Sequence, residues 1–411
     1  MKLFYQIIIH SVQLFLPLLK MLSPKLKLFV EGRTNWKSKL QSQVSDSDKV
    51  IWFHAASLGE YEQAVPVINA LKTAKPNYKI AVSFFSPSGY EVKKKDSKLD
   101  IVTYLPLDTR KNANEFLNIL NPEIAFIIKY EVWPNLMDAL FDKTIKTYLI
   151  SGLFRREQLY FRPMGRFMAE ALAKFEHIFV QNEDSLQLLK NQGFEKSSIS
   201  GDTRYDRVIA QLDMDNQLDF MDSFTASGEL TAVFGSTWAE DISVTLDAIN
   251  NAPKSMKLVI TPHQINSTQI QKLKKDISKK VICYSEIKNQ DLKDYEVLIL
   301  DTVGLLTKVY SYAHIAYVGG GMGNSGLHNI LEPAAFGIPI VIGKNYDKFP
   351  EAGKLRRLGG LFSVKDSAEF QSIFDKLITD SKFREKSGQI GGHFVNSEAG
   401  ATSKILSTID L

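Results

Sequence analysis

One stretch of the chain decides its fold: Ala316-Tyr-Val-Gly-Gly-Gly-Met-Gly-Asn-Ser-Gly-Leu-His-Asn-Ile-Leu-Glu-Pro-Ala-Ala-Phe-Gly-Ile-Pro-Ile-Val341. An apolar strand at 315–318 runs into glycines, then into a helix expected to open near His328, then into a second apolar strand at 338–342. Glycine lacks the Cβ that would keep a ligand off the backbone, and a helix N-terminus offers unpaired N–H groups and a positive dipole end. The pattern predicts an anion site, most naturally for a phosphate, with Glu332 placed for the two hydroxyls of a ribose. This stretch does not have the spacing G-x-G-x-x-G, followed by an acid, that is typical of dinucleotide-binding sites.

Around this stretch, apolar strands alternate with helical segments, as in parallel α/β proteins. The alternation begins at residue 49, is interrupted by a polar stretch, and restarts at residue 231. We therefore expect two Rossmann-like domains, 41–205 and 231–388, joined by a linker at 206–230 and facing a ligand-binding cleft. A last helix at 389–411 is expected to cross back to the first domain. The expected strands are 50–53, 80–85, 101–105, 124–128, 147–150 and 177–180, then 231–234, 257–260, 281–284, 297–300, 315–318 and 338–342.

The composition is that of a folded globular protein, with 44% hydrophobic and 23% charged residues in a chain of 411. The single cysteine, Cys283, excludes an internal disulfide framework and lies in an apolar run, which favours a buried strand residue over a nucleophile. The net charge is +4, but residues 1–40 carry seven basic side chains and one acid. The positive charge is therefore confined to the N-terminus, which is not the profile of a nucleic-acid-binding protein.

The N-terminal segment 3–19 is apolar but is interrupted by polar residues and by Pro17. A bilayer-spanning helix needs about 20 mostly apolar residues, so a single span, a helix lying in the membrane interface and a helix packed on the protein's own core all stay open. Lysines follow the segment in place of a signal-peptide cleavage site. Basic residues there would keep the bulk of the chain cytoplasmic and attract anionic headgroups. We expect residues 1–40 to be a membrane anchor with a basic juxtamembrane segment.

Two acids of the first half follow predicted strands. Glu60 lies in Trp52-Phe-His-Ala-Ala-Ser-Leu-Gly-Glu-Tyr-Glu62, and Glu131 lies in Lys129-Tyr-Glu-Val-Trp-Pro-Asn135. In an open α/β sheet the carboxyl ends of strands face the ligand crevice, and a carboxylate there can act as a general base on a hydroxyl. From position alone, Glu60 is equally well explained as a partner of the helix dipole, and Glu131 as a cap or a loop-holding carboxylate.

Basic residues supply further candidates. Arg155, Arg156 and Arg162 are interleaved with aromatic residues, which suits either a phosphorylated amphiphile at a membrane surface or an ordinary solvated helix face. Arg204 follows Gly201-Asp-Thr near the end of the first half and is expected to reach the cleft.

In the second half, Ser236 and Thr237 follow one strand and His263 ends the next. The hydroxyls can donate to a phosphate or cap a helix, and His263 either contacts a ligand or lies in a surface loop. No group of His, Cys and carboxylates has metal-ligand spacing, and neither a G-x-S-x-G elbow nor a Walker loop occurs.

A series of different short motifs, each present once, extends along nearly the whole chain after the expected N-terminal anchor. They are His54-x-x-Ser57-x-Gly-Glu60, Glu131-Val-Trp-Pro-Asn135, Gln181-Asn-Glu183, Gly201-Asp-Thr-Arg-Tyr-Asp206, Asp301-Thr-x-Gly304, Val318-Gly-Gly320, Gly326-Leu-His-Asn-Ile-Leu-Glu332 and Gly337-Ile-Pro339. This ordered set resembles the 3-deoxy-D-manno-oct-2-ulosonic acid (Kdo) transferases of Gram-negative lipopolysaccharide synthesis.

The resemblance implies a GT-B glycosyltransferase of lipopolysaccharide core biosynthesis that moves Kdo from CMP-Kdo onto a lipid A precursor of the lipid IVA type. It implies inversion, no catalytic metal and no cofactor. The implied partners are CMP-Kdo, the lipid A precursor and the membrane surface, and the implied location is the cytoplasmic face of the bacterial inner membrane.

By the same resemblance, the catalytic base maps onto Glu60, with Glu131 as a supporting or acceptor-site carboxylate. The CMP-Kdo site maps onto Ser236, Thr237, His263, Gly319, Gly320, Gly321, Met322, Ser325, Gly326, His328, Asn329 and Glu332.

The chain departs from the family pattern at three places: Ser151-Gly-Leu153 replaces an Asn-Ala-Arg stretch, Pro262 replaces an Arg, and Leu305 replaces a Glu. These departures leave open which cations hold the CMP phosphate and the Kdo carboxylate. The candidates for the acceptor or the carboxylate are Lys129, Arg155, Arg156, Arg162 and Arg204.

Two other functions stay open. One is a soluble nucleotide-sugar enzyme similar to UDP-N-acetylglucosamine 2-epimerase, which has no use for an anchor. The other is a catalytically silent, membrane-tethered nucleotide-binding protein, which would bind CMP without transferring a sugar.

Overall fold

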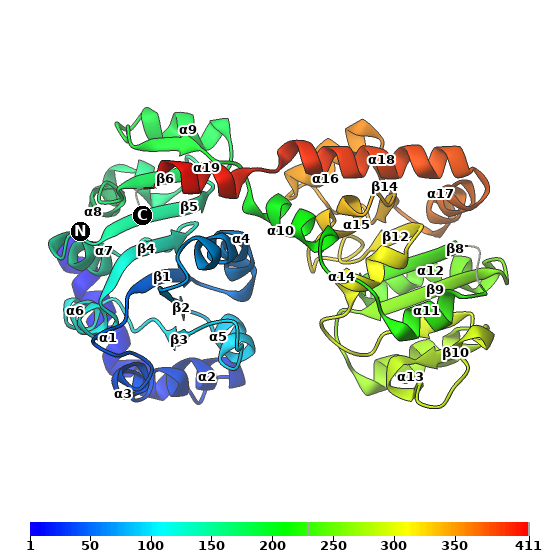
Figure 1. Ribbon diagram of the computed structural model, residues 1–411, viewed down its shortest axis with the longest axis horizontal. Coiled ribbons are helices and arrows are strands. Elements are labelled where there is room, and N and C mark those ends of the chain that lie inside the picture. The colour runs from blue at the N-terminus through cyan, green and yellow to red at the C-terminus, as the bar shows by residue number, and fades with distance from the viewer. Residues whose placement is uncertain (228–229, 410–411) are drawn as a thin grey trace. The chain divides into compact units, whose positions relative to one another are not determined.

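The computed structural model describes residues 1–227 and 230–409, and these form two compact α/β units (Figure 1). The first unit consists of Met1–Arg207 with Ala399–Leu411, and the second of Val208–Glu398. Residues 228–229 of the expected linker and 410–411 of the expected last helix lie outside the described residues.

The first unit is built on a seven-stranded parallel sheet in the order β3-β2-β1-β4-β5-β6-β7. Its central strands are buried on both faces, which is why they read as near-continuous apolar runs in the sequence. The strands are β1 (Val50–Ala55), β2 (Lys79–Phe84), β3 (Ile101–Tyr104), β4 (Pro122–Ile128), β5 (Lys146–Gly152), β6 (His177–Val180) and β7 (Ser197–Ile199). Six of them lie at the expected strands, and the three-residue edge strand β7 was not expected.

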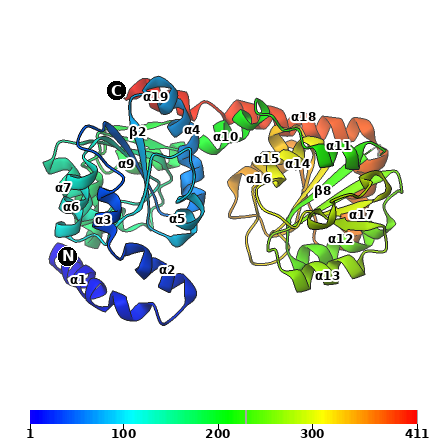
Figure 2. The same cartoon turned by 60° about the horizontal axis from the view of Figure 1, so that its bottom comes forward.

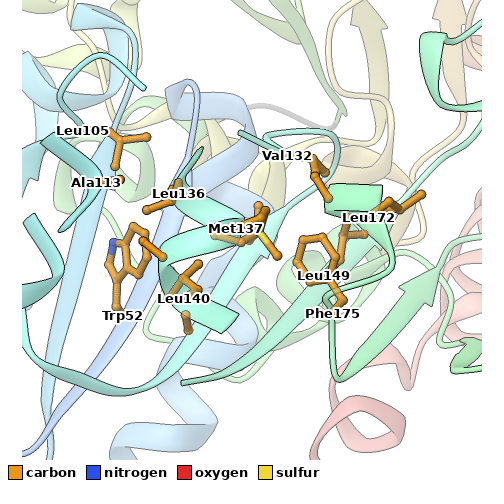
Figure 3. Packing of buried hydrophobic residues seen from close by; sticks show 14 of the residues in the cluster. Trp52, Leu105, Ala113, Val132, Leu136, Met137, Leu140, Leu149, Leu172 and Phe175 are labelled. Carbon is orange, nitrogen blue, oxygen red and sulfur yellow. The ribbon is translucent and has the colours of Figure 1, made fainter. Parts of the chain in front are cut away.

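Helices cover both faces of this sheet, and a large apolar cluster lies on one of them. Leu136 and Leu140 of α7 (Pro134–Asp142) reach toward Trp52 of β1, and Met137 lies beside them (Figure 3). The other helices of this unit are α1 (Lys2–Leu19), α2 (Pro24–Arg33), α3 (Trp36–Gln41), α4 (Leu58–Ala74), α5 (Pro87–Lys93), α6 (Arg110–Leu120), α8 (Arg166–Leu172), α9 (Glu183–Lys190) and α19 (Ala401–Thr408).

Helices α1 and α2 form a hairpin at one edge of the first unit (Figure 2). The Tyr5 hydroxyl donates to Asp108 at 2.7 Å, and Lys2 pairs with Asp138 at 2.7 Å, so α1 is bound to the unit by polar contacts. Most of its large apolar side chains are exposed. None of the helices in the described residues is both long enough and apolar enough to cross a membrane.

The rest of the segment expected as an anchor, residues 20–40, belongs to the folded unit. Arg33 is buried and donates to the carbonyls of Phe85 and Leu105 at 2.7 and 2.9 Å. Burial lowers the pKa of the Arg33 guanidinium to about 9, and Phe29 covers its face at 3.7 Å. At least one of the seven basic side chains in residues 1–40 therefore takes part in the packing of the folded unit.

The second unit repeats the construction with a parallel sheet in the order β10-β11-β9-β8-β12-β13-β14. Cys283 is buried in β10, as expected. The strands are β8 (Leu230–Thr237), β9 (Met256–Pro262), β10 (Val281–Cys283), β11 (Val297–Ile299), β12 (Ile315–Val318), β13 (Ile340–Ile342) and β14 (Leu361–Ser363). The edge strand β14 was not expected.

The helices of this unit begin at short polar caps where the sequence supplies them, such as Asn266 and Asp366, whose side chains accept the amides of Gln269 and Glu369. The helices are α11 (Asp219–Thr225), α12 (Ala239–Asn251), α13 (Ser267–Asp276), α14 (Leu306–Val309), α15 (Leu331–Ala335), α16 (Pro350–Leu358), α17 (Ser367–Thr379) and α18 (Ser381–Glu398).

The expected linker and last helix are organised differently from the expectation. The segment 206–230 contains most of α10 (Thr203–Leu212) and all of α11, whose Met221 and Phe224 are fully buried in the second unit. The last segment is two helices: α18 stays in the second unit, and α19 returns to the first.

Asp206 holds the returning segment. Its carboxylate accepts the amides of Gly400 and Thr402 at 2.6 and 2.7 Å and the Thr402 hydroxyl at 2.7 Å. It therefore caps α19, because the first amides of a helix have no partner within it.

We expect Asp206→Ala to loosen α19 by about 1–2 kcal/mol, because a lost helix cap costs about this much. Amide exchange over residues 401–408 should then become about 5–30 times faster. Hydrogen–deuterium exchange with mass spectrometry measures this, with Glu195→Ala, an exposed acid of the same unit, as the control. Unchanged exchange in Asp206→Ala would contradict the capping role.

Candidate active site

The strand order changes direction between β1 and β4 in the first unit, and between β8 and β12 in the second. The loops after such a pair of strands run to opposite sides, which leaves an open crevice at the carboxyl ends of the strands. Many of the predicted site residues lie at the ends of these four strands or just after them, whereas His263 follows β9, and Arg155, Arg156, Arg162 and Arg204 follow β5 or β7.

Glu60 lies in the first turn of α4, directly after β1. Its Oε2 accepts the amide of Ala56 at 2.6 Å, so it does hold the start of the helix. Burial raises the pKa of the Glu60 carboxyl, and the charge of Glu131 raises it further. The Ala56 amide and the charge of Lys129 act in the opposite direction. A carboxylate with a raised pKa is a better proton acceptor than an ordinary surface glutamate.

Glu131 follows β4 and is brought close to Glu60, although 71 positions separate them in the chain. Its side chain is 17% exposed, and its Oε2 accepts the indole N–H of Trp133 at 3.1 Å. The same oxygen lies 3.6 Å from Nε2 of His54. The structure thus places two carboxylates and an imidazole at one strand edge.

His54 was quoted in a motif but was not predicted as a site residue. It is fully buried in β1, where its Nδ1 lies 2.9 Å from the hydroxyl oxygen of Ser83 on β2. The signal in the sequence was an imidazole inside the apolar strand Trp52-Phe-His-Ala55, where a polar side chain needs a buried partner.

The basic candidates of the first unit differ in their exposure and in the groups that they act on. Lys129 has a left-handed backbone (φ 59°) directly after β4, and its charge acts on Glu60. Arg155 lowers the pKa of the nearby Tyr130 hydroxyl, against the larger effect of burial. Arg156 and Arg162 are exposed. Arg204 is engaged by Asp202, with nitrogen–oxygen distances of 2.7 and 2.8 Å.

In the second unit, a cavity of about 250 Å³ lies at the carboxyl ends of β8, β11 and β12. Four predicted residues line it: Ser236, His328, Asn329 and Glu332. Glu332 accepts hydrogen bonds from Asn329 at 3.1 Å and from the Thr307 hydroxyl at 3.0 Å. Lining residues that were not predicted are Gly304, Leu306, Thr307, Tyr310 and Val318.

Close packing of the backbone determines the shape of the glycine-rich loop at 319–326. Gly320 has φ +88°, and a Cβ there would lie 2.1 Å from the carbonyl oxygen of Gly326. Asp241, fully buried in α12, accepts the Gly320 amide at 2.9 Å and the Tyr317 hydroxyl at 2.8 Å. Asp241 was not predicted, and it ties the loop to the start of α12.

The expected helix start near His328 is wrong, because the His328 amide donates back to the Gly319 carbonyl at 3.1 Å and closes a loop. Helix α15 begins only at Leu331 and has five residues, so Glu332 is its second residue. The prediction of a phosphate site at a helix N-terminus near His328 is therefore corrected: this part of the chain is a closed loop.

The remaining predicted residues are spread around this loop. Ser325 is exposed, Met322 packs against the apolar core of the unit, and Gly321 and Gly326 belong to the loop itself. Thr237 lines a second cavity of about 640 Å³ between α12 and α13.

His263 and His328 form a stack with Trp238. The imidazole centroids are 4.3 Å apart, and the Trp238 indole lies 4.6 Å from His263. The Trp238 N–H donates to Nε2 of His328 at 3.1 Å. Burial lowers the pKa of His328 to about 4, with a further contribution from His263, and burial also lowers the pKa of His263. Near neutral pH, both rings are uncharged and supply hydrogen bonds rather than cationic charge.

Comparison with known proteins agrees with the motifs. Residues 32–207 match the family described as 3-deoxy-D-manno-octulosonic-acid transferase (Kdo transferase). The 3-deoxy-D-manno-octulosonic acid transferases of Aquifex aeolicus and Haemophilus influenzae are both 26% identical, over 84% and 87% of this chain and 91% and 85% of their own lengths. A bifunctional glycosyltransferase/methyltransferase of Fusobacterium nucleatum is 24% identical over 92% of this chain, and the chain spans 59% of that protein. These matches confirm the resemblance to Kdo transferases and support a glycosyltransferase.

Solved structures with a similar fold include UDP-GlcNAc 2-epimerase from Neisseria meningitidis, bound to UDP-GlcNAc, with a TM-score of 0.63 and 16% identity over 88% of this chain and 99% of that chain. MurG from Acinetobacter baumannii has a TM-score of 0.51 and 12% identity over 88% of this chain and 99% of that one. At these identities the likeness shows the two-domain α/β fold alone.

We expect Glu131→Gln to lower the pKa of Glu60, because the negative charge that raises it is removed. Glu60 should then stay ionised to a lower pH than in the unmodified protein. Carboxyl ¹³C NMR across a pH titration measures this, with Glu195→Gln as the control. An unchanged or higher pKa of Glu60 would show that the two carboxylates do not interact.

Proposed function

We propose that this chain is an inverting glycosyltransferase that transfers Kdo from CMP-Kdo to a lipid A precursor. The observation that carries the proposal is the partly buried carboxylate pair of Glu60 and Glu131 at the direction change of the first sheet. We infer the transferred sugar from the relatives, because two proteins that are similar over most of the chain are named Kdo transferases.

In the proposed step, Glu60 takes the proton of an acceptor sugar hydroxyl while that oxygen bonds to the anomeric carbon of Kdo. The bond from this carbon to the phosphate oxygen of CMP breaks on the opposite face, and CMP leaves with the electron pair. Inversion follows because the attack and the departure take place on opposite faces.

On the nucleotide side, the cavity of the second unit supplies hydrogen-bonding groups of the right kind. Glu332 would accept the ribose hydroxyls in addition to, or in place of, the donors from Thr307 and Asn329. Ser236 and His328 also line this cavity and can donate to oxygen atoms of the nucleotide. Groups that are already held in place lose little freedom on binding, which favours transfer.

The direct test is to incubate the purified chain with CMP-Kdo and a tetraacylated lipid A precursor and to weigh the lipid by mass spectrometry. A mass gain of one or more Kdo residues supports the proposal. Binding of CMP without any gain would favour a silent nucleotide-binding protein. Turnover of UDP-N-acetylglucosamine in its place would favour an epimerase.

We expect Glu60→Gln to lose roughly 10²–10⁴-fold in turnover, because general-base catalysis is worth about that much. CMP binding should stay unchanged, because the nucleotide candidates are other residues. Steady-state kinetics and calorimetry with CMP measure the two effects.

The matched control for this variant is Glu62→Gln on the same helix, whose carboxylate pairs with Arg207 at 2.7 Å. Its activity should stay close to that of the unmodified chain. Full activity of Glu60→Gln would remove Glu60 from the mechanism.

We further propose that α1 lies in the interface of the inner membrane at its cytoplasmic face. More than half of the exposed large apolar side chains in the described residues belong to the first 28 residues. Tyr5 of α1 packs on Phe167 at 5.7 Å, so the segment that carries Arg162 and Arg166 lies beside this helix. Basic residues next to an apolar helix suit an anionic lipid surface, where the acceptor also resides.

We expect the double variant Leu14→Glu/Leu18→Glu to bind vesicles of phosphatidylethanolamine and phosphatidylglycerol at least about 100-fold more weakly. Leu14 and Leu18 are 73% and 62% exposed, and burial of each leucine contributes about 1.5–3 kcal/mol. Vesicle co-sedimentation measures the partition. The matched control is Leu212→Glu/Leu358→Glu in the second unit, and equal binding of the two double variants would contradict the proposal.

A further inference from the structure

A buried line of hydrogen-bonding side chains ends at Glu131. The Trp52 indole N–H donates to Oγ of Ser83 at 2.8 Å, and this oxygen lies 2.9 Å from Nδ1 of His54. On the other side of the ring, Nε2 of His54 lies 3.6 Å from Oε2 of Glu131. Trp52, Ser83 and His54 are all fully buried, so bulk solvent does not reach these contacts. The line connects the interior of the sheet with the carboxylate beside Glu60.

The first two contacts favour one placement of the protons, against the Ser83 carbonyl oxygen, which lies farther away at 3.2 Å from Nδ1 of His54. A serine hydroxyl has one proton and can accept through its lone pairs. Because Oγ of Ser83 accepts from Trp52, its own proton is available for Nδ1 of His54. The ring proton of a neutral His54 then lies on Nε2 and faces Glu131. The opposite tautomer would direct the lone pair of Nε2 at a carboxylate.

Within the described residues, Nε2 of His54 is a buried nitrogen without a hydrogen-bond partner. A buried donor that stays unpaired costs about 1–3 kcal/mol, so a native structure seldom retains one without a use. Oε2 of Glu131 is the acceptor it faces, and that oxygen already accepts from Trp133. With its proton on Nε2, the ring would direct a second donor at this oxygen from 3.6 Å, and donors near a carboxylate stabilise its ionised form.

We propose that Ser83 and His54 are positioning residues that keep Glu131 ionised, so that Glu60 is the carboxylate that takes up a proton. When two neighbouring carboxylates share a site, the first proton binds to the one whose ionised form is less well stabilised. Glu131 faces two side-chain donors, whereas Glu60 accepts one backbone amide. The role in turnover rests on the proposed function, whereas the order of protonation does not.

Other groups near the pair do not reverse this order. The charge of Lys129 lowers the pKa of Glu60, but burial and the charge of Glu131 outweigh it. Burial raises the pKa of the Tyr130 and Tyr160 hydroxyls, so both are neutral at working pH. Arg155 acts on Tyr130.

The test is Ser83→Ala in the full-length chain. Without the hydroxyl, the acceptor within reach of Nδ1 is the backbone carbonyl of residue 83, at 3.2 Å. We expect the ring proton to move to Nδ1, which ¹⁵N NMR of the histidine side chains detects. Carboxyl ¹³C NMR should then show Glu131 taking its proton at a pH about one unit higher, and Glu60 at a lower pH. Turnover should fall about tenfold, because a pKa of Glu60 that is lower by about one unit corresponds to a tenfold weaker base. The KM for CMP-Kdo should stay unchanged.

The control is Thr147→Ala, which also removes a buried hydroxyl from the same sheet, one that donates only to the Ile145 carbonyl among the described residues. It should change neither the tautomer of His54 nor the order of protonation. If Ser83→Ala does not fold, Ser83→Cys keeps the volume with a weaker donor and should shift both signals in the same direction by a smaller amount.

The proposal is overturned if the proton stays on Nε2 in Ser83→Ala, in a neutral ring or an imidazolium, or if Glu60 and Glu131 still titrate in their original order. The NMR signals do not depend on the reaction. A reversed order together with no Kdo transfer by the unmodified chain would therefore reject the proposed function and retain the role of Ser83 and His54.

Discussion

Burial of both faces of each sheet is the constraint on which the rest of this structure depends. Apolar clusters cover the two sides of the first sheet, so its polar groups gather where the strands end. The reversal of strand order between β1 and β4 opens that edge, and Glu60 and Glu131 lie there. The second sheet repeats the arrangement with Ser236 and the loop that starts at Gly319.

Buried polar side chains hold the loops at these edges. Asp241 accepts the Gly320 amide from α12, and Asp108 accepts the amides of Asn135 and Leu136 at the start of α7, just after Glu131. Burial raises the pKa of Asp108, and the hydrogen bonds it accepts, led by the one from Tyr5, act against that rise. Each carboxylate satisfies backbone amides that a turning chain would otherwise leave unpaired. The loops that carry the candidate catalytic and nucleotide-binding residues are therefore held in place by hydrogen bonds to buried carboxylates.

Local sequence predicted most of the fold because buried strands in parallel sheets are continuous apolar runs. The edge strands β7 and β14 escaped prediction, since each has three residues and no such run. The helix start near His328 was wrong for a different reason. Its apolar neighbours follow a helical spacing, but the amide of His328 bonds to the carbonyl of Gly319 and closes a loop instead.

The sequence by itself determined the alternation of strands and helices, and it determined that Glu60 and Glu131 each follow a strand. These properties depend on residues that are neighbours in the chain. Only the tertiary structure decided that Glu131 lies beside Glu60 and His54, and that Asp241 binds the glycine loop 79 positions away. Those pairings follow from the order of strands in the sheets, which is set by the packing of the whole unit and cannot be seen in any local pattern.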